Sequence, residues 1–468
     1  MIKNIIVLFF KFITFYFHLI FLLFLYTIIS QNNELHAQNL NLIQDAEIET
    51  TIRKWVEPIF KVAGLNSEAV NIYIVDDNSI NAFVAGGQNI FINTGLILKA
   101  KEADALIGVL AHEIGHIAGG HLNRTINSMK DARSTMTIAT IITAGLMAAS
   151  SAAGMRTPGI SKLITLGPAI AQRNFYKNSR QNEKFADVAA LKYMESINRS
   201  SIPLANLLKD LGKQELLHEN RQDPYLRSHP ISRERIIEII EASKKINKNN
   251  IYKSPIDEIN YKRIVAKIIA FTNNPGKTLL LYPKSNKGIH AKYARAIAYL
   301  RMPDLDKGIK EINNLITNHI DDPFFPELLG QMLFENGEIY KSINELQKSA
   351  DMLPNNPIIL LSLSRSQIEF GEEKENNDAI INLKNILQIM PKNIAAWKLL
   401  SIAEARNNNI GLAQLASAES SFLRNDYNLA IQFAKKARIS FKKNDPSDIR
   451  ALDIIFFSYE KINKLEAN

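Results

Sequence analysis

A repeated pattern in the C-terminal third of the chain most constrains how it can fold. The stretch DPFFPELLGQMLFENGE begins at Asp322, and a stretch of matching pattern, NPIILLSLSRSQIEFGE, begins at Asn356, 34 residues later. A third unit starts near Pro391, after the insertion KENN. From about residue 286 onward, helix-forming segments alternate with short Pro, Asn and Gly breaks. A two-helix unit cannot bury its apolar face alone, so the pattern predicts several units that stack on one another.

Units of about 34 residues built from two helices are typical of tetratricopeptide repeats. We therefore expect residues 286–468 to form an α-solenoid of such repeats, rather than a generic helical bundle. The Asn- and Lys-rich stretch KKINKNNIYKSP marks a change of texture and predicts a linker over 253–285. It separates the repeats from a domain expected over 38–252. The expected fold class is α+β, mostly α.

The N-terminus is predicted to be a targeting segment. A short basic start, MIKN, precedes an almost wholly apolar run from Ile5 to Ser30. We expect residues 1–37 to be a signal peptide cut after Ala37. Because Phe12–Ser30 is long enough to span a bilayer, an uncut N-terminal anchor is the alternative. In both cases the body of the protein is exported.

Composition limits the chemistry and the partners. The chain has no cysteine, which excludes disulfides and thiolate metal sites, so any metal must be held by His, Asp or Glu. The formal net charge of +9 is spread over many lysines, without a nucleic-acid motif or an aromatic-interleaved basic stretch. We therefore expect a solvated, mildly basic surface and no nucleic-acid partner, with attraction to an anionic membrane as the second interpretation.

Residues 134–171 are rich in Ser, Thr, Ala and Gly and carry no charge before Arg156. They are predicted to form buried or lid-like helices beside the site, or a surface that touches lipid. A complete membrane span is less well supported because the hydrophobicity is modest. Membrane-surface contact through 134–171 therefore stays open.

The stretch AHEIGHIAGGHLNR, residues 111–124, carries the strongest chemical signal. It lies in a helix predicted over 102–122, where His112 and His116 are four positions apart and face the same way, so both imidazoles can reach one ion. Glu113 lies beside them as the candidate general base. Such a pair suits one Zn²⁺ per chain, which with three protein ligands keeps a fourth position open.

The third ligand has two candidates. A metzincin pattern would require histidine where the chain has Leu122, and His121 comes one residue early. On a continuous helix His121 lies on a different face from His116, so we expect it to point away from the metal. The alternative is Glu183 in QNEKFADVAALKYM, with Asp187 on the same helix face. Asp187 would then accept the second N–H of a ligand histidine.

His229, in RSHPISRER, is a further candidate. The plain interpretation of this segment is a surface helix start, since Pro suits the first helical position. The functional interpretation brings His229 to the metal, where it would stabilise an oxyanion or compete for the open position. Arg235 would then bind Glu183, Asp187 or substrate.

Secondary-structure signals upstream place a helix over 45–63 and strands over 71–75 and 89–93. We expect an extended substrate to pair by β-augmentation with the second of these strands. Its contact positions would be Asn89, Phe91 and Asn93.

Several motifs together resemble one peptidase family. HEIGH, EKFAD, SHPISRER and NAFVAGGQNIFINTGLI are similar to the gluzincin peptidases that include the CAAX prenyl endopeptidase and the heat-shock membrane protease HtpX. The resemblance covers about residues 45–245. It implies a zincin-type metallopeptidase domain with zinc ligands His112, His116 and Glu183. It also implies Glu113 as general base and His229 as a site histidine.

The order of leader, protease and repeats resembles the exported bacterial members of that family. This resemblance implies a zinc endopeptidase in the periplasm; membrane association is the alternative left open by the leader and by residues 134–171. It would act on unfolded or stalled outer-membrane proteins, with the repeats docking on the barrel-assembly machinery. Only the leader is strongly hydrophobic, which argues against prenyl-peptide processing and an integral-membrane protease. The rival hypothesis is a periplasmic chaperone or scaffold that acts through its repeats and holds a structural zinc.

Overall fold

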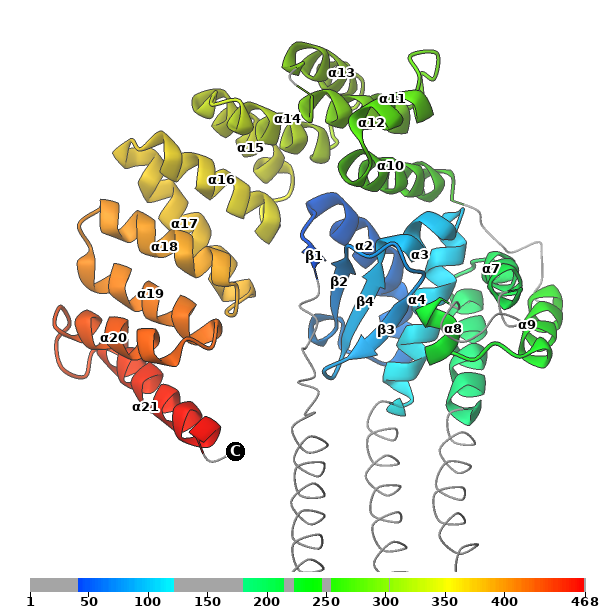
Figure 1. Cartoon of the computed structure of the whole chain (residues 1–468), viewed down its shortest axis with the longest axis horizontal. Helices are drawn as coiled ribbons and strands as arrows, with labels where there is room; N and C mark the ends of the chain where they lie inside the picture. Colours follow the sequence, from blue (N-terminus) through cyan, green and yellow to red (C-terminus); the bar gives the residue numbers. More distant parts are fainter. Residues whose placement is uncertain (1–40, 122–179, 214–222, 246–253, 303, 467–468) are drawn as a thin grey trace, which may run out of the picture. The chain divides into compact units, whose positions relative to one another are not determined.

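A four-stranded sheet forms the centre of the N-terminal half. The strand order is β1-β2-β4-β3, with β2 and β4 parallel and the two outer strands antiparallel to their neighbours (Figure 1). The strands are β1 (Leu42–Ile43), β2 (Asn71–Val75), β3 (Ala82–Ala85) and β4 (Asn89–Asn93). The strands predicted over 71–75 and 89–93 are confirmed. β3 was missed because its residues precede a Gly-Gly turn and were interpreted as part of it.

The computed structural model describes most of the chain, in five ranges of residues. They are residues 41–121, 180–213, 223–245, 254–302 and 304–466.

The predicted leader over 1–37 and the small-residue stretch over 134–171 both lie outside the described ranges. Among the helices that are described, none combines the length and the apolar character that a bilayer crossing requires.

Two helices pack with the sheet into one apolar core. The helix α2 (Ala46–Ala63) is capped by Asp45, whose carboxylate accepts a hydrogen bond from the backbone N–H of Ile48 at 2.9 Å. The helix α4 (Ala103–Ala118) is buried over its first thirteen residues and packs against α2, β3 and α7 (Ile202–Gly212). This burial makes α4 a rigid base for side chains near its C-terminal end.

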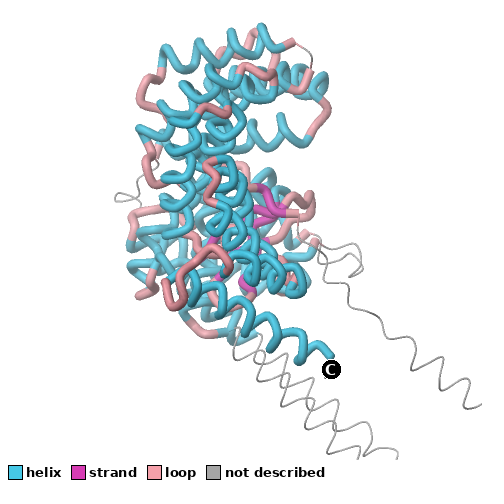
Figure 2. The backbone as a smooth tube through the Cα atoms, turned by 90° about the vertical axis from the view of Figure 1, so that its left-hand side faces the viewer, coloured by secondary structure: helices cyan, strands magenta, loops and turns pink. Residues whose placement is uncertain are grey.

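Shorter elements complete this half of the molecule. They are η1 (Ser67–Ala69), α3 (Thr94–Lys99), α8 (Pro224–Ser228), α9 (Arg233–Lys245) and a helical stretch over residues 180–196. Strands occur in one place only among the described residues, and the rest of the regular structure is helical (Figure 2).

Paired helices make up the C-terminal half. From α14 onward, each helix contacts the next, and the pairs follow one another along the chain (Figure 1). They are α14 (Phe324–Glu335), α15 (Ile339–Met352), α16 (Pro357–Phe370), α17 (Glu373–Ile389), α18 (Ile394–Arg406), α19 (Ile410–Leu423), α20 (Tyr427–Arg438) and α21 (Pro446–Glu466). The predicted helical repeat is confirmed, and the overall class is α+β, mostly α.

Helices also occupy the segment that was expected to be a linker. Within 253–285 the chain forms α10 (Pro255–Thr272) and α11 (Pro275–Leu281). α10 packs against α12 (Ile289–Leu300), which is followed by α13 (Leu305–Asn318), and it also contacts α2, α3 and α4. The polar residues that suggested a linker lie partly on the outer face of α10 and partly in a buried ionic cluster.

That ionic cluster joins α2 to α10. Lys267, 2% exposed, places its Nζ 2.8 Å from Asp45 Oδ2 and 3.4 Å from Glu47 Oε2. Arg263 donates to Glu47 Oε1 at 2.7 Å, and the Tyr293 hydroxyl donates to Glu47 Oε2 at 2.8 Å. Burial alone would raise the pKa of Glu47, but the charges of Arg263 and Lys267 hold it below its ordinary value. The cluster is therefore charged and mutually compensated.

Replacing Lys267 by Met should destabilise the protein strongly. The substitution leaves buried carboxylates without their cation, a change that typically costs about 3–5 kcal/mol. Urea unfolding followed by circular dichroism measures the loss. Lys348→Met is the matched control, because this exposed lysine has Glu345 on α15 as its one ion-pair partner among the described residues and should change stability by less than about 1 kcal/mol. Equal effects of the two substitutions would contradict this account.

Glu327, on α14, should make stability depend on pH. Burial raises its pKa to about 7 from 4.5, although Lys267 opposes the shift. Between those values the folded state holds a proton that the unfolded state has released, so this group lowers the unfolding free energy as pH rises. Glu327→Gln should therefore reduce the stability lost between pH 5 and pH 8, measured by urea unfolding. Glu335→Gln, on the exposed face of α14, should leave that difference unchanged.

Candidate metal centre

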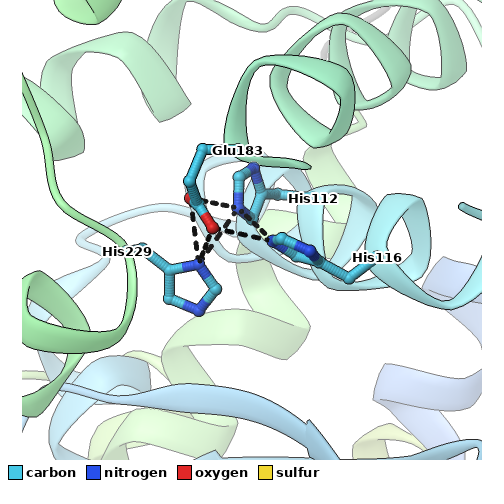
Figure 3. A group of neighbouring side chains, drawn as sticks. All are labelled: His112, His116, Glu183 and His229. Atoms are coloured by element: carbon cyan, nitrogen blue, oxygen red, sulfur yellow. Dashed lines mark hydrogen bonds and ion pairs between the residues drawn. The ribbon is translucent and has the colours of Figure 1, made fainter. Parts of the chain in front are cut away.

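Four side chains from three separate segments converge beside the C-terminal end of α4. His112 and His116 come from α4, Glu183 from the helical stretch over 180–196, and His229 from the residue that ends α8 (Figure 3). Their ligand atoms all lie within 4.8 Å of one another. His112, Glu183 and His229 are buried, and His116 is partly buried. The set contains three imidazoles and one carboxylate.

The distances between these atoms fit a metal ion. His112 Nε2 lies 3.1 Å from His116 Nε2, and each of these nitrogens lies 3.4 Å from an oxygen of Glu183. His229 Nδ1 lies 3.4 Å from His112 Nε2 and 3.1 Å from Glu183 Oε2. Donors about 2.0–2.1 Å from a tetrahedral zinc ion are separated by roughly 3.3 Å. Both the nitrogen and oxygen chemistry and the spacing therefore suit zinc.

Close packing at Gly115 brings the Glu183 helix to α4. A Cβ on Gly115 would lie 3.1 Å from Ala186 Cα and 3.2 Å from Ala189 Cβ. Any side chain there would push the two helices apart. The glycine between the two histidines of the motif therefore sets how near Glu183 can come to them.

Behind the donors, Asp187 and Arg235 form a second layer. Asp187 Oδ1 lies 3.0 Å from His112 Nδ1, and Arg235 donates to both oxygens of Asp187 at 2.8 and 2.9 Å. Arg235 Nη1 is also 3.2 Å from Glu183 Oε2. Burial would raise the pKa of Asp187, but hydrogen bonds from His112 and Arg235 hold it below its ordinary value. The ionised carboxylate can orient His112 with Nε2 toward the donor set.

Glu113 is buried beside the donors. It is 1% exposed, and its Oε1 accepts no hydrogen bond from the described residues. The imidazole of His229 lies beside it, with Nε2 3.4 Å from Glu113 Oε1. Burial raises the pKa of Glu113, against the opposing effect of His229 and His112. A buried carboxylate with a raised pKa is a stronger proton acceptor than an exposed one.

His121 does not point away from the site, so that expectation is wrong. α4 ends at Ala118, and Gly120 adopts a left-handed φ of 63°, which turns the chain back. His121 Nδ1 then lies 2.8 Å from His116 Nδ1. A Cβ on Gly119 would lie 2.3 Å from His121 Nε2, so only glycine leaves room for this ring. His121 supports His116 from behind and is not one of the four converging residues, and the Gly-Gly pair was the signal for the turn.

The sheet order also corrects the expected substrate strand. β4 lies between β2 and β3, so both of its edges are already paired. Phe91 stacks between Tyr73 and Phe83, Asn93 donates to Ser79 Oγ at 2.9 Å, and Asn89 donates to the carbonyl of Gly86. These side chains hold the sheet together. The outer edge of the described sheet on the α4 side is β3, which contacts α4.

Tyr225 is a site residue that sequence reasoning missed. It is 1% exposed, and its ring lies 4.7 Å from the ring of His229, centroid to centroid. Its backbone N–H donates to the carbonyl of Ile80, which ties α8 to the loop before β3. Tyr225 thus places His229. The only sequence signal for its role is its position four residues before His229, and it belongs to none of the recognised motifs.

Comparison with known proteins agrees with this geometry. Residues 43–243 match peptidase family M48, whose members are typically zinc-dependent. The chain is 25% identical over 372 residues to the putative beta-barrel assembly-enhancing protease of Vibrio cholerae, covering 78% of this chain and 74% of that protein. It is 22% identical over 376 residues to the beta-barrel assembly-enhancing protease of Escherichia coli, covering 80% and 75%.

Among solved structures, YrrB, described as a TPR protein with an unusual peptide-binding site, is similar at 15% identity. The similarity covers 38% of this chain and 91% of YrrB, with a TM-score of 0.32. The peptidase match is the informative one, because it spans the sheet, α4, Glu183 and His229. Residues 43–243 are therefore similar to the peptidase domain of family M48, and the protein is a metalloprotease.

Proposed function

We propose that this metalloprotease is a zinc endopeptidase of the bacterial cell envelope that acts on misfolded or stalled outer-membrane proteins. The observation that carries the proposal is the buried convergence of His112, His116 and Glu183 beside the buried carboxylate Glu113. The names of the two relatives support the substrate class. A periplasmic location, a leader over 1–37 and domain limits of 38–252 and 286–468 are parts of the same proposal.

In this proposal His112, His116 and Glu183 hold the zinc ion and Glu113 moves the proton. When bound, zinc supplies Lewis acidity, which polarises a peptide carbonyl and makes water a stronger acid. Glu113 takes a proton from the attacking water onto its carboxylate and passes it to the leaving amine. Burial raises the pKa of Glu113, which makes its carboxylate a stronger base for the first transfer.

The substrate would lie extended along β3, where the sheet still has an outer edge on the α4 side. Main-chain pairing to a strand edge recognises an extended segment regardless of its sequence. Unfolded barrel strands have this form, and a folded protein does not offer it. The predicted contact thus moves from β4 to β3.

His229 has two possible roles, and one substitution separates them. Its Nδ1 stands at the donor set and its Nε2 faces Glu113. If it stabilises an oxyanion, His229→Ala should lower the cleavage rate about 10²–10³-fold. If it takes the fourth ligand position, the same substitution should raise the rate, since water gains that position.

Glu113→Gln should keep zinc and lose cleavage. General base catalysis contributes about 10²–10⁴-fold, and glutamine preserves the shape of the side chain but cannot accept the proton. Cleavage of a fluorescent unfolded casein and zinc content by mass spectrometry measure the two effects. Glu68→Gln, at an exposed position, is the control and should leave both unchanged. Undiminished cleavage by Glu113→Gln would overturn the assignment.

His121→Ala should weaken zinc binding by about 10–100-fold, because His116 loses the partner that sets its ring orientation. Competition with a fluorescent zinc chelator measures the affinity. His319→Ala serves as the control, since this histidine lies beyond the peptidase domain at the end of α13. Unchanged zinc affinity in His121→Ala would show that the 2.8 Å contact has no role in ligand orientation.

One observation favours a second candidate function. The donor set includes His229 as a fourth protein residue, and zinc sites with four protein ligands are typically structural. The protein would then be a chaperone or scaffold that acts through its repeats. Expression of Glu113→Gln in cells lacking the protein tests this: rescue of outer-membrane assembly supports the scaffold, and failure supports the protease.

A further inference from the structure

A groove on the repeats shares no residue with the metal centre. Its volume is about 1050 Å³, and most of its lining comes from the segment between the end of α17 and α20. Three residues of the N-terminal half, Gln44, Asn71 and Tyr73, complete the wall. This volume is at the upper end for a small-molecule pocket, which typically measures about 300–1,000 Å³.

The charges in this groove have one sign. Lys392, Lys398 and Arg424 line it, and no aspartate or glutamate does. None of the three cations has an ion-pair partner among the carboxylates of the described ranges. The nearby acids of α18 and α19 are already used: Glu404 pairs with Lys384 at 3.0 Å, and Glu419 pairs with Arg450. The groove therefore presents positive charge that no carboxylate of the described residues neutralises.

Apolar side chains lie among these cations. Ile389 is 52% exposed, and Met390, Ile394 and Ile402 are each at least 38% exposed. Exposed apolar residues gathered in one recess mark a binding surface more often than a random scatter does. An occupant that satisfies both features needs apolar side chains next to carboxylates.

We propose that this groove binds an extended polypeptide segment in which large apolar residues alternate with acidic ones. The proposal extends the proposed function, because it gives the repeats a defined class of partner. It rests on the idea that this protein handles unfolded chains. The groove proposal can be tested separately from the protease activity, because binding in the groove needs neither Glu113 nor zinc. A flat membrane is a poorer fit than a peptide, because the cations lie in a recess.

Fluorescence anisotropy of a labelled peptide tests the proposal directly. The probe is a peptide of about twelve residues in which Leu and Phe alternate with Glu. A second peptide has Gln in place of every Glu. Both are titrated with the full chain carrying Glu113→Gln, so that neither is cleaved. The acidic peptide should bind at least about tenfold more tightly, and its affinity should fall as salt rises.

Charge-reversal variants locate the site. Lys398→Glu combined with Arg424→Glu should raise the Kd of the acidic peptide at least about tenfold, because two cations become repulsive. Lys398→Arg should retain binding. Lys348→Glu on α15 and Lys464→Glu on α21 have the same exposed character outside the groove and should retain it too. Thermal melts of every variant separate loss of binding from loss of fold.

Three results would overturn the proposal: equal binding of the Glu and Gln peptides, unchanged binding in the groove variant, or equal loss in the control variants. Binding of the wild type to anionic phosphatidylglycerol vesicles, abolished by the groove variant while peptide binding persists, would assign the cations to a membrane instead. Casein cleavage is measured alongside, in the groove variant with an intact Glu113 and in Glu113→Gln. Loss of peptide binding with intact dependence of cleavage on Glu113 means that the groove proposal alone fails. Peptide binding with undiminished cleavage by Glu113→Gln means that the proposed function alone fails.

Discussion

The close approach of two helices at Gly115 is the contact on which the metal centre depends. α4 carries His112 and His116, and the helical stretch over 180–196 carries Glu183. A Cβ at Gly115 would stand 3.1 Å from Ala186 Cα, so a larger residue would press the two helices apart. Because α4 is buried along most of its length, such a shift is opposed by close packing. The missing side chain thus favours the close approach of the donors.

Two of the buried charged clusters among the described residues serve different purposes. At the metal centre, Arg235 and Asp187 neutralise and orient groups that face an ion. Between α2 and α10, Lys267 and Arg263 neutralise Glu47 and hold two halves of the chain in contact. In both places the removal of a single partner would leave an uncompensated charge in a low-dielectric interior, which is costly. The groove on the repeats differs, because its cations are exposed and no carboxylate of the described residues pairs with them.

Much of the site could be predicted from the sequence. The four-residue spacing of His112 and His116, and of Glu183 and Asp187, places each pair on one helix face, and the structure brings all four together. This placement could be predicted because it depends on the geometry of one helix at a time. The helical repeat was predictable for a related reason, since each unit repeats its own local pattern. Zinc was predictable from the spacing of His112 and His116 beside Glu113, and the absence of cysteine limited the ligands to His, Asp and Glu.

Other features depended on how separate segments meet. The turn at Gly120 brings His121 behind His116, although a continuous helix would have pointed it away. The strand order places β4 inside the sheet and leaves β3 at its edge, which no periodicity of a single strand reveals. The residues that form one helix or one repeat were therefore determined by the sequence alone, through local hydrogen bonding and side-chain period. Which strand is exposed, and which histidine supports which, was decided only by the tertiary structure, because packing sets the distances between segments far apart in the chain.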